Sequence, residues 1–140
     1  MSAPAWAADY IGIPYVDAGR TRQGCDCYGL VRLVLAEQFG QGLPLVPERY
    51  ATDRQAREDM ARVRATALAL VPSDELAPGQ EQAGDIINIR VLGQPLHVGV
   101  VAAPGWMLHA QRGVGAALES YMGSKWAPRV LGFYRPRRAA

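Results

Sequence analysis

The chain is poor in cysteine, in net charge and in long apolar runs. It has two cysteines among 140 residues, Cys25 and Cys27, and its formal net charge is +2. Two cysteines separated by one residue make no disulfide framework, because a bridge between them would strain the backbone, so we expect free thiols. A nearly balanced charge gives no reason to expect a nucleic-acid partner.

Membrane and secretory segments are missing as well. No run of apolar residues is long enough to span a bilayer. Residues 1–10 lack the basic start and apolar stretch of a secretory signal peptide. We therefore expect synthesis in the cytoplasm without a signal peptide, and no membrane span. With 49% hydrophobic and 20% charged residues, residues 1–140 are expected to form a single domain whose core needs no metal or cofactor.

Helical patterns precede strand patterns along the chain. A short helix is predicted over residues 4–12 and further helices over 27–39 and 53–70, with an extended segment at 43–47 and a polar loop at 72–83. Strands are predicted over residues 85–91, 97–101, 107–110, 115–121 and 129–134. Helices followed by a run of short strands predict an α+β domain with an antiparallel sheet.

Cys27 stands on the first turn of the predicted helix over residues 27–39. A helix N-terminus favours the thiolate, which is the nucleophilic form of cysteine. Asp26 is the expected N-cap, and Gly29 removes bulk beside the thiol so that another segment or a substrate can approach. A buried cysteine that only fills space is the ordinary alternative. Cys25 lies before the cap, so we expect it to be a bystander thiol.

The only two histidines, His97 and His109, stand on predicted strands. A lone histidine on a strand is more often structural than catalytic. Here, however, a turn over residues 102–106 would place His109 beside His97, and Gly99 leaves room on the same strand face. A thiol, a base and a third group that orients the base are the parts of a Cys-His hydrolase. The sequence therefore predicts that Cys27, His97 and His109 share one site.

Five short motifs follow one another along the chain. They are Ile-Gly-Ile-Pro-Tyr at 11–15, Gly-Cys-Asp-Cys-Tyr-Gly-Leu-Val at 24–31, Gly-Asp-Ile-Ile at 84–87, His-Val-Gly-Val at 97–100 and Leu-His-Ala at 108–110. In this order they resemble the NlpC-type cell-wall peptidases, papain-like cysteine enzymes, over nearly the whole chain. The resemblance implies a papain-like α+β fold with N-terminal helices packed on a small antiparallel sheet. It also implies hydrolysis of an amide in the peptide stem of peptidoglycan, with the bond between D-glutamate and the diamino acid as the expected target.

By position, the resemblance implies a Cys-His-His triad without a cofactor or metal. Cys27 would be the nucleophile, His97 the base and His109 the orienting residue. Tyr15 matches a family tyrosine beside the active site whose hydroxyl would help stabilise the oxyanion, although a rim or core aromatic is an equal alternative. The backbone N–H of Cys27 is the other expected oxyanion donor, because the first N–H groups of a helix have no intrahelical partner.

Tyr28 departs from the family pattern, which often has Ser after the nucleophile. We therefore expect Tyr28 to change contacts with the substrate. Residues 16–19 also lack the common Trp-Gly-Gly. Together with the loop at 19–24 and the ending at 131–136, the aromatic at position 28 resembles the branch found in phage tails and gene transfer agents. That branch implies a component of a phage-like particle that acts at the cell wall, with other tail or hub proteins as partners.

Two functions of other classes stay open. Cys25, Cys27, His97 and His109 could form a Cys2His2 zinc site, although Cys-x-Cys is tighter than the usual ligand spacing. The domain could also be a catalytically silent structural component of a tail. The complete set of one nucleophilic cysteine and two histidines argues against that second alternative.

Overall fold

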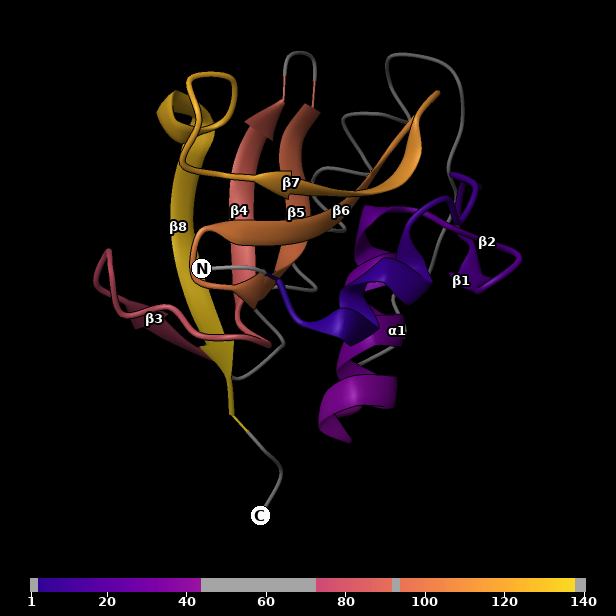
Figure 1. Ribbon diagram of the computed structural model, residues 1–140, viewed down its shortest axis with the longest axis horizontal. Coiled ribbons are helices and arrows are strands. Elements are labelled where there is room, and N and C mark those ends of the chain that lie inside the picture. The colour runs from indigo at the N-terminus through magenta and orange to yellow at the C-terminus, as the bar shows by residue number, and fades with distance from the viewer. Residues whose placement is uncertain (1–2, 44–72, 92–93, 138–140) are drawn as a thin grey trace.

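The computed structural model describes residues 3–43, 73–91 and 94–137. Across these ranges the fold is α+β, as predicted, with a single α-helix and antiparallel sheets (Figure 1). The helix predicted over 53–70, and all but the first residue of the extended segment at 43–47, lie outside the described residues. No helix in the described part of the chain is both long and apolar enough to cross a membrane.

The helices and strands follow the predicted order. They are η1 (Ala5–Tyr10), β1 (Arg20–Thr21), β2 (Gly24–Cys25), α1 (Cys27–Phe39), β3 (Ser73–Leu76), β4 (Ile86–Val91), β5 (Gln94–Ala103), β6 (Trp106–Gln111), β7 (Gly115–Ser120), η2 (Ala127–Arg129) and β8 (Val130–Pro136). The predicted helix over residues 4–12 is a 3-10 helix, η1. The predicted helix over residues 27–39 has the same limits as α1.

In the described part of the chain, six strands form one antiparallel sheet in the order β3-β8-β4-β5-β6-β7. β8, β4 and β5 run side by side, and β6 and β7 cross them at a steep angle (Figure 1). The last strand of the chain, β8, therefore lies between β3 and β4 rather than at an edge. β1 and β2 pair separately as a short hairpin directly before α1.

The polar loop predicted over residues 72–83 is partly wrong, because β3 occupies its first residues. Ser73 pairs with Pro136 and Leu76 with Phe133, along the outer side of β8. An edge strand with exposed Asp74 and Glu75 lacks the apolar alternation of a half-buried strand, and for that reason its sequence resembles a loop.

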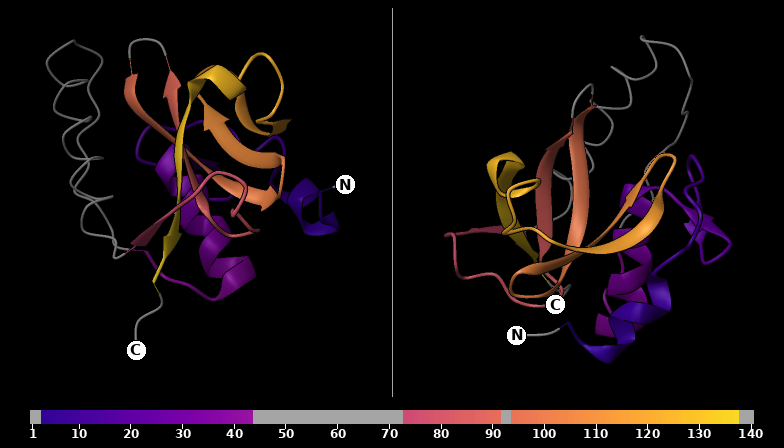
Figure 2. Two further views of the ribbon diagram at one scale, coloured as in Figure 1. Left: turned by 90° about the vertical axis from the view of Figure 1, so that its left-hand side faces the viewer. Right: turned by 45° about the horizontal axis from the view of Figure 1, so that its top comes forward.

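The apolar side of α1 packs on the middle of the sheet, against β5 and β6 (Figure 2). Leu30, Val31, Val34 and Leu35 are fully buried, as their spacing predicted. They belong to one core cluster with Val100 and with other side chains of β5 and β6. The α1 helix ends at Gly40, which is its left-handed C-cap with φ of 61°.

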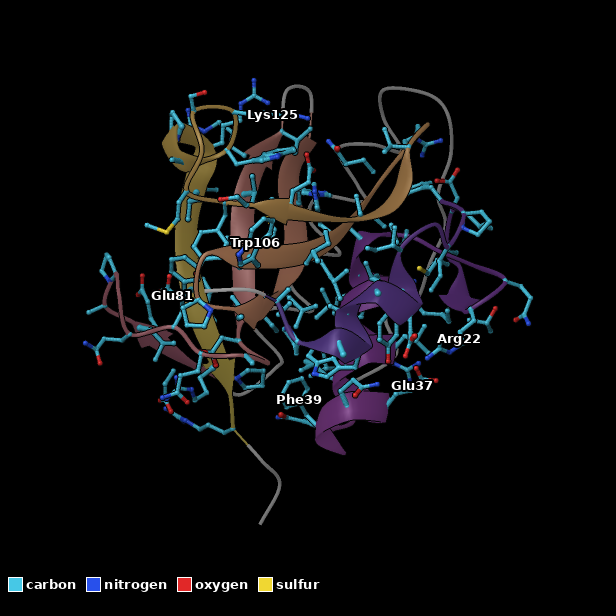
Figure 3. All side chains as sticks on the ribbon, viewed as in Figure 1. Arg22, Glu37, Phe39, Glu81, Trp106 and Lys125 are labelled. Atoms are coloured by element: carbon cyan, nitrogen blue, oxygen red, sulfur yellow. The ribbon has the colours of Figure 1, made fainter. Side chains whose placement is uncertain are left out.

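Polar contacts attach η1 and the hairpin to the outer face of α1. The hydroxyl of Tyr10 donates to Glu37 at 2.7 Å. Arg22 forms an ion pair with the same carboxylate at 2.7 Å, and these two side chains meet beside α1 (Figure 3). Tyr10 of η1 and Arg22 of the hairpin turn thus meet at Glu37, in the last turn of α1, and attach both segments to the helix.

Candidate active site

The start of α1 is fixed by Asp26, as the sequence predicted. The carboxylate of Asp26 accepts a hydrogen bond from the backbone N–H of Gly29 at 2.7 Å, and Arg20 donates to the same oxygen at 2.7 Å. Asp26 is completely buried, and Cys27 is the first residue of the helix. Cys27 therefore lies at the positive end of the helix dipole, where a thiolate is favoured.

Gly29 allows the hairpin to approach the helix. A Cβ atom at this position would lie 2.1 Å from the carbonyl oxygen of Gly19 and 2.9 Å from the Arg20 guanidinium. The segment that approaches Gly29 closely, as expected, is therefore the one that leads into β1. Because position 29 has no side chain, β1 packs directly against the first turn of α1.

The two histidines come together through the pairing of β5 with β6. Gly99 is the register partner of His109, so His97 lies diagonally across the pair of strands. Nε2 of His97 and Nδ1 of His109 are 2.8 Å apart, and both side chains are buried. A Cβ atom on Gly99 would lie 3.2 Å from Cβ of His109, so the absence of a side chain at position 99 lets β5 and β6 pair closely at His109.

Cys27 and His97 line the same pocket. It lies where the start of α1 meets the ends of β4, β5 and β6. The residues around it are Tyr15, Cys27, Val91, His97, Ala110, Gln111 and Arg112. The structure thus brings the predicted nucleophile and base to one cavity, with His109 directly behind His97.

Tyr15 and Arg112 form part of the pocket wall. The guanidinium of Arg112 lies 5.3 Å from the centroid of the Tyr15 ring and makes an ion pair with Asp17 at 2.5 Å. Tyr15 also forms an isolated parallel bridge with Cys25. The sequence singled out Tyr15 but not Arg112, which lies three residues beyond His109 on the turn after β6.

Tyr28 has a different environment from Tyr15. It is 3% exposed, belongs to the core cluster around α1, and is absent from the residues that line the pocket. The Arg20 guanidinium lies 5.5 Å from the centroid of its ring. Burial raises the pKa of the Tyr28 hydroxyl, which the positive charges of Arg32 and Arg20 partly offset.

Cys25 is a free, fully buried thiol on β2 and lies outside the pocket lining. Burial and the nearby Asp26 carboxylate raise its pKa to about 11, so it is a poor nucleophile near neutral pH. Among the described residues, no group of three or more His, Cys, Asp or Glu side chains has an arrangement that could hold a metal ion. The four side chains of the zinc alternative therefore do not converge on one point.

Glu119 contacts the candidate site through His109, and the sequence did not reveal it. Its carboxylate Oε2 makes a short contact with Nε2 of His109, on the side of the ring away from His97. Glu119 lies on β7, opposite Met107 in the strand register and therefore diagonal to His109. Positions 117 and 119 lie on the same face of the sheet as His109 because of the register of β6 and β7. Side-chain alternation along the sequence predicts this only when that register is known.

Burial and neighbouring charges have opposite effects on the pKa values of His109 and Glu119. Desolvation lowers the pKa of His109, and Glu119 only partly restores it, so the imidazole is neutral near pH 7. Burial raises the pKa of Glu119, but His109, the indole of Trp126 and the charge of Lys125 outweigh it and leave a lowered pKa. The Trp126 N–H is close enough to act on this carboxylate without making a well-formed hydrogen bond.

Comparison with known proteins gives a consistent result. Residues 12–135 match the sequence model of the NlpC/P60 family. The protein named Gamma-DL-glutamyl hydrolase from Bacillus subtilis (strain 168) is 28% identical over 133 residues. The match covers 92% of this chain and 27% of that protein, so the chain spans about a quarter of the length of this relative.

Solved structures have the same fold. An NLP/P60 family protein similar to a lipoprotein, from Staphylococcus aureus, matches with a TM-score of 0.61 and 24% identity, over 95% of this chain and 39% of that one. The NlpC/p60 domain of the peptidoglycan hydrolase SagA matches with a TM-score of 0.60 and 23% identity, over 95% and 94%. NlpC2 from Trichomonas vaginalis matches with a TM-score of 0.64 and 17% identity, over 96% and 44%. At these identities the matches establish the fold.

Proposed function

The chain belongs to the NlpC/P60 family, and we propose that it is a cysteine peptidase that hydrolyses an amide bond in the peptide stem of bacterial peptidoglycan. One observation carries the proposal. Cys27, at the start of α1, and His97, held against His109 at 2.8 Å, line the same pocket. These are the parts that nucleophilic catalysis by a thiol needs.

The proposed reaction has two halves. The Cys27 thiol gives its proton to His97, and the thiolate attacks the carbonyl carbon of the scissile amide. The tetrahedral intermediate collapses to a thioester, and the His97 imidazolium protonates the amine that leaves. A water molecule, activated by His97, then hydrolyses the thioester and regenerates the thiol. His109 keeps His97 oriented through both halves.

The oxyanion of each tetrahedral intermediate needs hydrogen-bond donors. We assign this role to the backbone N–H of Cys27 and the hydroxyl of Tyr15, which lines the same pocket. Tyr28 keeps its proposed effect on substrate choice, but from inside the core cluster it would act by shaping the start of α1. Neither role requires a cofactor or a metal.

The proposed bond is the one between D-glutamate and the diamino acid of the stem peptide. The name of the Bacillus subtilis relative, a glutamyl hydrolase, supports a bond made through a glutamate side chain. The family resemblance of the five motifs supports the same choice. Digestion of purified peptidoglycan, followed by mass spectrometry of the released muropeptides, tests both the activity and the bond.

The result separates the two classes of function. Released peptides with wild-type protein, and none with the Cys27→Ala variant, are expected from the proposed enzyme. If wild-type protein releases no peptide from walls of several compositions, a structural role without catalysis is favoured.

We also propose that the chain is a component of a phage-like particle that carries it to the cell wall. Tyr28, the loop over residues 19–24 and the ending over 131–136 support this assignment. Proteomic analysis of purified particles from the source culture tests it. Absence of the chain from particles that contain their other tail proteins would refute the assignment and leave the proposed catalysis untouched.

A further inference from the structure

Glu119 contacts His109 on the side away from His97, and it determines which ring nitrogens of the two histidines carry protons. A neutral imidazole carries one proton, on one of its two ring nitrogens. An ionised carboxylate only accepts hydrogen bonds. Glu119 is such a carboxylate, because the groups around it keep its pKa low, and it contacts Nε2 of His109. In a neutral His109 the proton is therefore on Nε2, where it is donated to Glu119.

This assignment determines the next one. With its proton on Nε2, His109 has a lone pair on Nδ1, the atom that lies 2.8 Å from Nε2 of His97. A hydrogen bond across that distance requires His97 to be the donor, so the proton of neutral His97 is on Nε2. The Nδ1 nitrogen of His97 is then the basic one, ready to take a proton from a thiol.

We propose that Glu119 is a positioning residue that fixes the proton arrangement of His109 and, through it, leaves Nδ1 of His97 basic toward Cys27. This inference rests on the proposed function, in which His97 is the base. After proton transfer from Cys27, His97 is an imidazolium, and the ordered chain through His109 ends on the negative charge of Glu119. That charge stabilises the imidazolium and hence the thiolate.

Without Glu119 the same geometry permits the wrong arrangement. His109 would be free to carry its proton on Nδ1 and donate it to Nε2 of His97. His97 would then hold its own proton on Nδ1 and have no lone pair for the thiol. The Glu119 carboxylate excludes this state. If the single proton of neutral His109 were on Nδ1, Nε2 would have no proton to donate to that carboxylate.

Other charged groups near the pair come from the segment after β7. Nζ of Lys125 lies 3.5 Å from Oε1 of Glu119, and His109 contacts the other carboxylate oxygen, Oε2. Lys125 and Arg129 also approach the ring of Trp126, which packs edge-on against His109 with ring centroids 5.0 Å apart. Lys125 projects from the loop above the strand ends in Figure 3. Its positive charge opposes that of a protonated His109, which is the opposite effect to that of Glu119.

The test replaces the carboxylate with its isosteric amide, Glu119→Gln, in a Cys25→Ala background so that Cys27 is the only thiol. The rate of alkylation of Cys27 by iodoacetamide is measured between pH 5 and 10. We expect the midpoint of thiolate formation to move upward by about half a pH unit or more. The negative charge of Glu119 stabilises the imidazolium of His97, and its removal therefore also destabilises the Cys27 thiolate. With peptidoglycan as substrate, kcat should fall on the order of tenfold at unchanged KM. This fall is smaller than the whole contribution of general acid–base catalysis, because His97 is still present.

Two further variants separate positioning from a structural role. Glu119→Asp keeps the charge and should give a midpoint between those of the parent and Glu119→Gln. Lys125→Met removes the ion-pair partner on Oε1 of Glu119 and keeps the contact with His109, so it should leave the midpoint of thiolate formation unchanged or lower it slightly. A Lys125→Met variant that reproduces the upward shift, or a Glu119→Gln variant with an unshifted midpoint, would overturn the proposal.

Nuclear magnetic resonance gives a second readout that needs no substrate. The chain has only two histidines, so a nitrogen-15 spectrum of the imidazoles contains two rings, which a His109→Ala sample assigns. The parent should show the Nε2–H form for both rings, and Glu119→Gln should show Nδ1–H character in at least one. An Nδ1–H form of His109 in the parent refutes the inference. Failure of the parent to digest peptidoglycan refutes the proposed function instead.

Discussion

At the residue scale, the two cysteines differ in surroundings although one residue separates them. Both are nearly inaccessible, with exposures of 0% for Cys25 and 1% for Cys27. Cys25 lies on the hairpin, where burial and then the nearby carboxylate of Asp26 raise the pKa of its thiol. Cys27 stands on the helix and lines the pocket. The exposed fraction alone therefore does not distinguish the two thiols, and the prediction that Cys27 is the nucleophile rests on its place at the helix start and in the pocket lining.

Replacing each thiol by a hydrogen atom tests this difference. Cys27→Ala is expected to abolish hydrolysis of peptidoglycan while the melting temperature stays close to that of the parent, because the loss of one sulfur atom leaves the Asp26 cap and the apolar packing of α1 in place. Cys25→Ala is expected to retain most of the activity. Muropeptide release and thermal unfolding measure the two properties. Loss of activity in Cys25→Ala, with Cys27→Ala active, would identify the other thiol as the nucleophile.

The two histidines should differ in the size of their effect. His97→Ala removes the base and is expected to lower kcat by roughly 10²–10⁴-fold, the usual contribution of general acid–base catalysis. His109→Ala removes only the orienting group, so we expect a smaller loss. Steady-state kinetics on a soluble stem peptide measure both. Equal losses would indicate that His109 also takes part in proton transfer.

At the scale of elements, α1 begins where Asp26 meets both the helix and the hairpin. Asp26→Ala removes the N-cap, a loss of about 1–2 kcal/mol, and leaves the Arg20 guanidinium, 14% exposed, without its carboxylate. We expect a clear fall in the free energy of unfolding by urea. Asp74→Ala breaks an exposed ion pair with Arg137 and is the control, with an expected cost of about 0–1 kcal/mol. Equal costs would contradict the role of the cap.

The pairing of β5 with β6 depends on Gly99. A Cβ atom there would lie 2.9 Å from the backbone oxygen of Leu108, 3.2 Å from Cβ of His109 and 3.2 Å from Cγ2 of Ile87. Gly99→Ala is therefore expected to cost about 1–3 kcal/mol of stability, as overpacking does, and to lower kcat by displacing His109. Gly123→Ala, where a Cβ would meet nothing within 4 Å, is the matched control. Unfolding and kinetics of the two variants should differ if the strand spacing is as described.

At the scale of the whole molecule, the buried His109 makes stability depend on pH. Its pKa in the folded protein lies below the ordinary 6.5 because burial disfavours the charged ring. The unfolded chain therefore binds more protons below pH 6.5, and the stability present above that pH is lost as pH falls toward the folded pKa. We expect the melting temperature to fall between pH 7 and 5.

A His109→Gln variant serves as the control, because it lacks the titrating ring. Its melting temperature should vary less over the same interval than that of the parent, whatever its absolute value. Parallel curves would show that other groups cause the pH dependence. Depressed carboxylates such as Glu119 add a further loss only below about pH 4.5, their ordinary pKa.

The local features of this protein are determined by the sequence itself. Asp26 and Gly40 mark the ends of α1, the spacing of Leu30, Val31, Val34 and Leu35 marks its buried side, and short apolar runs mark β4 to β8. These signals depend on neighbours within a few positions, and for that reason one sequence is enough to read them. The motifs around Cys27, His97 and His109 similarly predict the site residues.

Only the tertiary structure decides which distant residues meet. The pairing of β3 with β8 is hidden because an edge strand carries no apolar alternation. The contact of Glu119 with His109 depends on the register of β6 and β7, and a shift by one residue would turn Glu119 to the other face of the sheet. Register is set by turn geometry and by packing over the whole sheet. The sequence thus predicts Cys27, His97 and His109 as site residues, and the fold decides that Glu119 lies behind them.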